Sequence, residues 1–319
     1  MPGIFEQLKD GQDRFVLPYA DILGDRFAAI TDGSVGLVEG SHPVDPLFGD
    51  DPILRQVQMI PMPEGGRAVP RITTAPNYRP MAPGFYRRGQ LTDPVLGGWS
   101  ATPRVLATIA RVAKSVIMQD HDGTMERLVR DALVRSMRDG LTDMLLAGVG
   151  TDPSGSPPTW EGLGIMNDPG VHGHTYANAG QLADTDILSA VGTLTASRVD
   201  EANITALLSP SGFRYCLKTG RSIAEIPMLT GRRLLGLWPA YESIYMPDYL
   251  DSTNALEDVG GTMILGDFSY AAIALFGAGV EIQVAGIRDP SEVEIAGLVH
   301  YDVGALDPSA FNVITRAAS

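Results

Sequence analysis

Few side chains in this sequence combine in a pattern that could carry out chemistry. His172 and His174 flank one glycine in a glycine-rich loop, a spacing at which two imidazoles could bind one metal ion. Asp120, His121 and Asp122 follow one another and could form an acid–base pair in which a carboxylate orients the imidazole. One interpretation of the chain is therefore a soluble metal-dependent hydrolase, whose site would be assembled from the histidines at 121, 172 and 174.

The local context favours a structural role for each of these groups. No third metal ligand stands near His172 and His174, so a polar loop is the preferred interpretation. The two aspartates beside His121 directly precede a predicted helix, where carboxylates stabilise the helix dipole. Cys216 lies on the apolar face of a predicted short helix, as a buried inert thiol would. We find no Walker loop, nucleophile elbow or dinucleotide-binding motif, and we predict a non-enzymatic protein without cofactor or metal.

Composition and charge exclude several classes of protein. The 319 residues include 38 acidic and 24 basic side chains, for a net charge of −14, whereas a protein that mainly grips nucleic-acid phosphates needs a basic face. A single cysteine excludes an internal disulfide framework. No apolar run is long enough to cross a bilayer, and the first residues lack the pattern of a signal peptide. We expect a soluble, intracellularly made protein with no membrane partner.

The clearest predicted element is a long helix over residues 124–147. Its apolar residues recur at spacings of three and four: Met125, Leu128, Val129, Ala132, Leu133, Met137, Leu141, Met144 and Leu145. Asp122 or Thr124 can cap its start, and Gly148 can supply a left-handed stop. The opposite face of the helix carries charged residues, which indicates either a solvated face or a contact with another subunit.

The rest of the chain mixes strands and helices irregularly. Residues 1–70 are acidic, turn-rich and poorly periodic, which is typical of an arm that contacts a partner or its own body. Glycine and proline interrupt residues 71–103 so often that we predict a projecting two-stranded hairpin there. A buried strand is predicted at 204–208, with a helix on either side of it. Because strands and helices do not alternate regularly, the predicted fold class is α+β.

Four sequence blocks, in this order, resemble those of a known family. They are the long helix with Leu145-Leu-Ala-Gly-Val-Gly-Thr-Asp-Pro, then Ala206-Leu-Leu-Ser-Pro-Ser-Gly-Phe, Leu234-Leu-Gly-Leu-Trp-Pro, and Ile264-Leu-Gly-Asp-Phe-Ser-Tyr followed by Gly279-Val-Glu-Ile-Gln-Val. The closing Asp307-Pro-Ser-Ala-Phe-Asn-Val-Ile is similar to the family's terminal strand. Each block alone is weak, but together, in this order, they cover about residues 70–316. The chain is thus similar to the major capsid proteins of tailed bacteriophages, which have the Hong Kong 97 fold.

The resemblance implies a division of the chain. Its parts would be an N-terminal arm over 1–70, an extended loop over 71–103, a peripheral domain over 104–160 and 286–319 with a spine helix at 124–147, and an axial domain over 161–285. It implies a shell subunit that self-assembles into hexamers and pentamers of an icosahedral head around double-stranded DNA. Such a protein belongs to the virion capsid and is made in the host cytoplasm.

The extended loop is where we expect contacts between subunits. The predicted anchors are Tyr86, Arg87, Arg88 and Trp99, because arginine and aromatic residues dominate interfaces. The loop contains no lysine, which excludes isopeptide cross-linking there. Implied partners are other copies of the chain, DNA bound without sequence specificity, and portal and scaffolding proteins, with a decoration protein left open. An encapsulin-like cargo nanocompartment with the same fold is the alternative, although the long acidic segment 1–70 favours the phage capsid.

Overall fold

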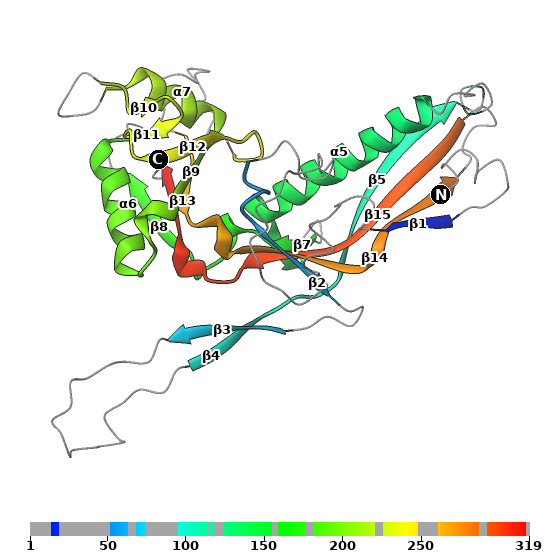
Figure 1. Ribbon diagram of the computed structural model, residues 1–319, viewed down its shortest axis with the longest axis horizontal. Coiled ribbons are helices and arrows are strands. Elements are labelled where there is room, and N and C mark those ends of the chain that lie inside the picture. Colours follow the sequence, from blue (N-terminus) through cyan, green and yellow to red (C-terminus); the bar gives the residue numbers. More distant parts are fainter. Residues whose placement is uncertain are drawn as a thin grey trace, which may run out of the picture.

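The computed structural model describes residues 14–18, 52–62, 68–74, 95–113, 115, 117, 124–152, 154, 159–176, 182–220, 226–247, 261–286 and 292–316. These residues form an elongated body built around one long helix and a lobe of short strands and helices (Figure 1). Within this part of the chain, no helix has both the length and the hydrophobicity to span a bilayer.

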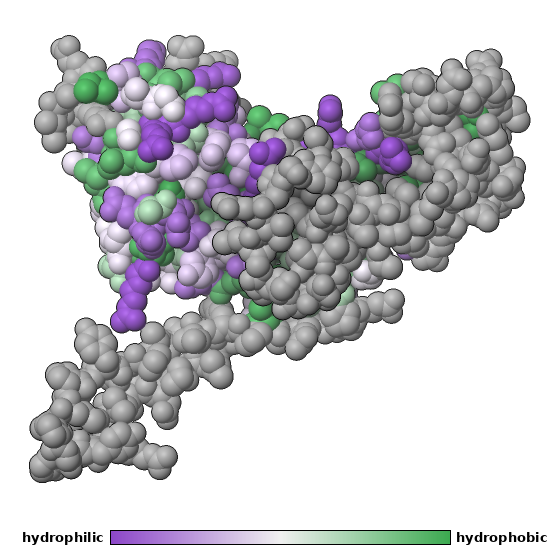
Figure 2. Space-filling view, viewed as in Figure 1, coloured by the Kyte–Doolittle hydropathy of each residue, from purple (hydrophilic) through white to green (hydrophobic). Residues whose placement is uncertain are grey.

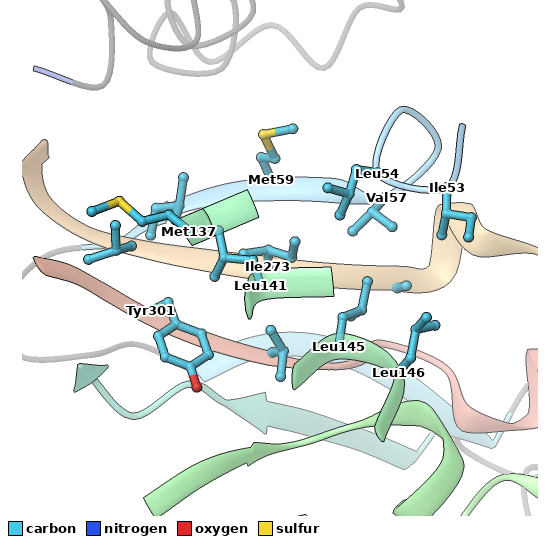
Figure 3. Packing of buried hydrophobic residues seen from close by; sticks show 14 of the residues in the cluster. Ile53, Leu54, Val57, Met59, Met137, Leu141, Leu145, Leu146, Ile273 and Tyr301 are labelled. Atoms are coloured by element: carbon cyan, nitrogen blue, oxygen red, sulfur yellow. The ribbon is translucent and has the colours of Figure 1, made fainter. Parts of the chain in front are cut away.

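The elongated body is a five-stranded sheet covered on one face by a long helix. Its elements are β1 (Arg14–Pro18), β2 (Gln58–Met62), β5 (Arg104–Ala113), α5 (Thr124–Ala147), β14 (Ala271–Gly286) and β15 (Glu292–Ala305). The strand order is β1-β14-β15-β5, and β2 also pairs with β14. The helix occupies the predicted range, and its apolar stripe is buried against the sheet from Leu133 to Leu146, whereas Leu128 nearer its start is 54% exposed. Figure 3 shows Met137, Leu141 and Leu145 of this stripe facing Ile273 of β14.

The lobe is a seven-stranded sheet with two helices. Its elements are β8 (His172–Tyr176), α6 (Asp184–Ala196), β9 (Thr205–Leu208), α7 (Pro210–Lys218), β10 (Leu229–Thr230), β11 (Arg233–Leu234), β12 (Trp238–Glu242), β13 (Met263–Gly266) and β16 (Phe311–Arg316), with short 3-10 turns at Ile165–Asn167, Glu201–Asn203, Phe268–Tyr270 and Pro308–Ala310. The strand order is β10-β11-β12-β9-β13-β16-β8. Ser209 caps α7 by accepting a hydrogen bond from the Gly212 amide, and Pro210 follows at the first helical position, so local sequence explains where α7 begins.

Both faces of the central strands in the lobe are covered. Leu207, Ile264 and Val313 are register partners on β9, β13 and β16, and they belong to the core that also contains the α5 stripe. Their neighbours on the opposite face, such as Leu208 and Met263, join a second core with α6 and α7. The lobe is therefore packed onto the elongated body through one face of its sheet and onto its own helices through the other.

Two hairpins complete the described structure. Strands β3 (Ala68–Thr74) and β4 (Val95–Ser100) pair antiparallel, as predicted for this stretch, and project away from the body (Figure 1). Strands β6 (Val149–Asp152) and β7 (Thr159–Leu163) form a second antiparallel hairpin directly after α5. The sequence predicted only a loop at this second position.

The sequence-based division of the chain cuts through paired strands. Its boundary at 285 separates β14 from β15, although these two strands pair over most of their length. It groups β16 with the peripheral range 286–319, whereas β16 lies between β13 and β8 in the lobe. It also assigns residues 52–62 to the arm, although Ile53, Leu54 and Val57 are buried in the main core. Local patterns do not encode pairing between residues far apart in sequence, which is why these boundaries differ.

Candidate assembly surfaces

Only one of the four predicted anchors lies within the described residues. Tyr86, Arg87 and Arg88 fall outside them. Trp99 lies on β4, is half-buried, and packs against a small core that includes Met62 and Phe276. A Cβ atom on Gly304 would stand 2.5 Å from Trp99 Nε1, so the indole and β15 are in close contact. Trp99 thus holds the base of the β3–β4 hairpin on its own chain, and its contact with a neighbouring subunit stays a prediction.

The two histidines on β8 face α6. His172 Nε2 is 3.1 Å from Ser197 Oγ, and His174 Nε2 is 3.3 Å from Asp186 Oδ1. No group of three histidine, cysteine or acidic residues that could hold a metal ion occurs among the described residues. The triplet at 120–122 lies outside them. These hydrogen bonds give both imidazoles a role in attaching the edge strand β8 to the helix beside it.

Cys216 is fully buried on α7, as predicted from its apolar surroundings. Burial raises the pKa of its thiol to about 12. The thiol therefore stays protonated at neutral pH and is a poor nucleophile.

A buried ion pair joins β5, β15 and the β6–β7 hairpin. Arg104 at the start of β5 pairs with Asp302 on β15, whose side chain is only 4% exposed. Asp302 also accepts hydrogen bonds from the amides of Thr102 (2.8 Å) and Val303 (3.0 Å). Burial raises the pKa of Asp302 above its ordinary value, against the opposing effect of these donors. The guanidinium of Arg104 also donates to Thr151 Oγ1 on β6, at 3.0 and 3.1 Å, so one side chain links three strands.

Close backbone contacts fix the same hairpin on the end of α5. A Cβ atom on Gly148 would stand 2.4 Å from the Gly162 carbonyl oxygen and 2.5 Å from that of Met144. A Cβ atom on Gly162 would stand 2.3 Å from Val303 Cγ2. The prediction that Gly148 provides a left-handed stop is wrong, because the glycine with a positive φ at this helix end is Gly150, at 84°. Glycine is needed at position 148 because a Cβ atom would clash with the neighbouring backbone, and not because the position has a left-handed conformation.

The β6–β7 hairpin presents an exposed tryptophan. Trp160 on β7 is 65% exposed, although tryptophan is usually among the more buried residues. It lies opposite Thr151 in the strand register, and directly opposite residues share a face of a hairpin. Glu161 accepts a hydrogen bond from the Val149 amide at 3.1 Å, which adds a further tie between the strands. An exposed indole on a paired strand is a candidate anchor for an interface.

Sequence reasoning missed this anchor because an exposed and a buried tryptophan look alike in sequence. Trp160 stands between polar residues and glycine, next to a proline-rich stretch that indicates a loop. Trp160 is exposed because of the register in which β7 pairs with β6, and the hairpin is held in place by the tertiary contacts of Arg104 and Gly162. No local signal shows those contacts.

An open apolar strip follows the outer side of β5. Residues along β5 alternate between partly covered and exposed, and Val105 and Ile109 are 55% and 59% exposed. Ala107 lies between them on the same side, whereas Leu106 on the other side contacts Gly140 of α5. β5 is also the last strand on its side of the sheet, so one row of its backbone groups has no strand partner in the described structure. An open apolar strip on an edge strand favours contact with another protein surface.

Sequence comparisons and structural comparisons give different results. No sequence profile of a known protein family matches the chain. No curated protein matches it by sequence. Solved capsid structures do match over most of its length.

The capsid of an empty GTA particle matches with a TM-score of 0.62 and 15% identity, covering 89% of this chain and 94% of that one. The satellite phage P4 procapsid, a structure that includes a size determination protein, matches with a TM-score of 0.59 and 13% identity, covering 91% and 96%. A virus-like particle from Pyrococcus furiosus matches with a TM-score of 0.52 and 9% identity, covering 85% and 95%. The chain therefore has the α+β fold of phage capsid proteins, as the resemblance predicts.

Proposed function

We propose that this chain is the major capsid protein of a tailed phage, which self-assembles into hexamers and pentamers of an icosahedral head around double-stranded DNA. The observation that carries the proposal is its likeness to capsid structures across nearly its whole length. In this proposal the protein is made in the host cytoplasm and resides in the virion. Portal and scaffolding proteins would be its partners during assembly.

The surfaces of the elongated body fit this role. α5 covers one face of the sheet, while the strip at Val105, Ala107 and Ile109 and the indole of Trp160 stay open. We propose that a second copy of the chain covers these groups in the shell. Stable assemblies bury large areas on each subunit, and aromatic anchors contribute most of the binding energy in such interfaces.

We also propose a division of the chain into arm, extended loop, peripheral domain and axial domain, with boundaries changed from those predicted from sequence. The arm is shortened from 1–70 to 1–51 and the extended loop from 71–103 to 75–94, while residues 52–62 and β14 join the peripheral domain with α5, β5 and β15. The axial domain is then the seven-stranded lobe, including β16. This division follows the sheets rather than continuous stretches of sequence.

The charge of the chain suits a DNA container. A net charge of −14 gives a wall that DNA does not bind tightly, so that DNA can be packaged and later released. The packaged DNA would then be kept inside by the closed shell, with counterions neutralising its phosphates, and no DNA sequence would be preferred.

Assembly of the purified chain is the direct test. Analytical sedimentation and negative-stain microscopy of wild-type protein should show closed particles of megadalton mass. A chain that stays monomeric at all salt and protein concentrations would overturn the proposal.

The Trp160→Ala variant tests the proposed anchor separately. Because Trp160 is mostly solvated, its removal should change the melting temperature little, while assembly should need at least about tenfold more protein. The matched control is Leu188→Ala, because Leu188 is also an exposed apolar residue but lies on α6. This variant should assemble as wild type does. If both variants assemble alike, Trp160 is not an anchor, although the shell function would stand.

A cargo-holding nanocompartment shell is the second candidate. It is favoured by the likeness to the virus-like particle from Pyrococcus furiosus. Nuclease-protected DNA of uniform length inside purified particles supports the phage head. Particles that contain a defined protein and no protected DNA support the compartment.

A further inference from the structure

The edge of the seven-stranded sheet at β10–β12 ends in two tight turns with unusual backbone geometry. We call residues 229–238 the double-turn tip. Its left-handed residues are Gly231, Arg232, Leu235 and Gly236, with φ values of 58°, 59°, 50° and 72°. Arginine and leucine rarely adopt this conformation, which costs about 1–2 kcal/mol for each residue. Such strain persists only where the surrounding structure holds it, and it concentrates at functional sites.

Several contacts hold the strained backbone in place. The buried Leu235 donates its amide to the Met228 carbonyl oxygen at 2.6 Å. The amide of Ala240 donates to the carbonyl oxygen of Arg232 at 2.9 Å, and Arg233 Nη1 donates to that of Leu237 at 3.3 Å. The double-turn tip is therefore fixed in shape before any partner arrives.

The tip combines positive charge with an exposed apolar side chain. Arg232 and Arg233 are exposed, and Leu237 beside them is 56% exposed. Arg232 forms no ion pair with any residue that the structure describes. Helix α7, which packs on β10, adds the exposed Arg214. This is a basic, partly apolar edge on a chain whose net charge is −14.

We propose that the double-turn tip docks on a second copy of this chain, with Arg232 and Arg233 facing its carboxylates and Leu237 covered between them. The proposal rests on the proposed function, because an assembled shell supplies the second copy. Charge complementarity favours a second copy as the partner, because each chain carries 38 acidic residues against 24 basic ones and so offers an excess of carboxylates to a basic tip. A rigid tip also loses little conformational entropy on docking.

A contact between the tip and DNA phosphates is the competing interpretation. The exposed Leu237 argues against it, since an apolar side chain gains nothing from a phosphate backbone. The strong acidity of the whole chain also disfavours approach to DNA.

The first test reverses one charge at the tip. Arg232→Glu should raise the protein concentration needed for assembly at least about tenfold, with an unchanged melting temperature. Arg198→Glu is a closely matched control, since Arg198 is also exposed and left-handed, with a φ of 69°. That control should assemble within about twofold of wild type.

The second test locates the partner. Arg232→Lys keeps the charge and adds an amine, which a carbodiimide joins to a carboxylate in direct contact. Assembled particles of this variant should give a cross-linked dimer, and mass spectrometry should place the bond on an acidic residue of the second copy.

The outcomes separate the two proposals. If wild type never assembles, the proposed function fails and the docking of the tip fails with it. If wild type assembles and Arg232→Glu assembles at the same concentration, only the docking fails. If Arg232→Glu assembles normally but its particles retain less DNA, the tip is a phosphate contact and the proposal is overturned.

Discussion

The two sheets of this molecule are covered very differently. In the lobe, strands β9 and β13 are buried along their full length, with one core on each face. In the elongated body, β5 alternates between covered and exposed residues, and its outer strip is open. The central strands of the lobe are covered within one chain, whereas the edge strand β5 leaves its outer strip open to a partner. The comparison indicates that open contact area lies at the edges of the sheets, while their central strands are packed within the chain.

The elongated body contains two ion pairs that can be compared directly. Two arginine–carboxylate pairs join the same two strands, β5 and β15. Arg104–Asp302 is largely buried, with side-chain exposures of 19% and 4%, while the Arg111 side chain in the pair Arg111–Glu294 is 61% exposed. The two pairs therefore differ mainly in burial.

The largest expected effect comes from breaking the buried pair. Arg104→Met should lower the free energy of unfolding by about 3–5 kcal/mol, because it leaves the buried Asp302 carboxylate without its counter-charge. Arg111→Met should change it by less than about 1 kcal/mol. Urea unfolding followed by circular dichroism measures both. Equal losses in the two variants would contradict the idea that burial decides the importance of the pair.

A smaller effect is expected from adding one methyl group at a glycine in each region. Gly148→Ala should destabilise the protein by about 2–3 kcal/mol, because the new Cβ atom meets two backbone carbonyl oxygens. Gly192 on α6 has no atom within 4 Å of a Cβ position, so Gly192→Ala should stabilise the helix by about 0.5–1 kcal/mol. Thermal melts of both variants would show opposite shifts. A stabilised Gly148→Ala would mean that the hairpin is not pressed onto α5 as described.

The smallest effect concerns an acidic pair between α5 and β7. Burial, and then the nearby Glu161, raise the pKa of Asp143 above its ordinary value of 3.8. The folded protein therefore holds this proton more tightly than the unfolded chain, and stability falls as pH rises from 3.8 toward the folded pKa. Asp143→Asn should raise stability at pH 7 on the order of 0.3 kcal/mol, since the side chain is only partly buried and solvent screens much of the effect.

The pH profile of melting temperature tests this expectation. The advantage of Asp143→Asn over wild type should shrink as pH falls to 4, where wild-type Asp143 binds its proton. Asp139→Asn on the same helix, whose carboxylate pairs with Arg138 at 3.4 Å, should give no gain at pH 7. A gain from Asp143→Asn that is the same at every pH would have another cause.

Local elements were predictable from sequence because their signals are local. The apolar spacing over 124–147 predicted α5 residue by residue, and Ser209-Pro210 marked the start of α7. The resemblance in four blocks predicted the capsid fold, which the structural comparisons confirm.

Long-range contacts were not predictable in this way. Arg104 and Asp302 are 198 residues apart, and neither stands in a motif. The exposure of Trp160 and Leu237 depends on which strands pair, and the left-handed φ of Arg232 depends on tertiary contacts. The candidate surfaces therefore came almost entirely from the structure.

The position of β16 has a consequence for the order of events during synthesis. This strand, Phe311–Arg316, enters the lobe between β13 and β8, so the sheet cannot close until those residues have left the ribosome. Pairing between segments far apart in sequence, such as β16 with β8, also slows folding because a long loop has to be closed first. A nascent or prematurely terminated chain would lack a closed lobe, and with it the support beneath the double-turn tip. A chain that ends before β16 would therefore be unable to form the β13–β16–β8 part of the sheet.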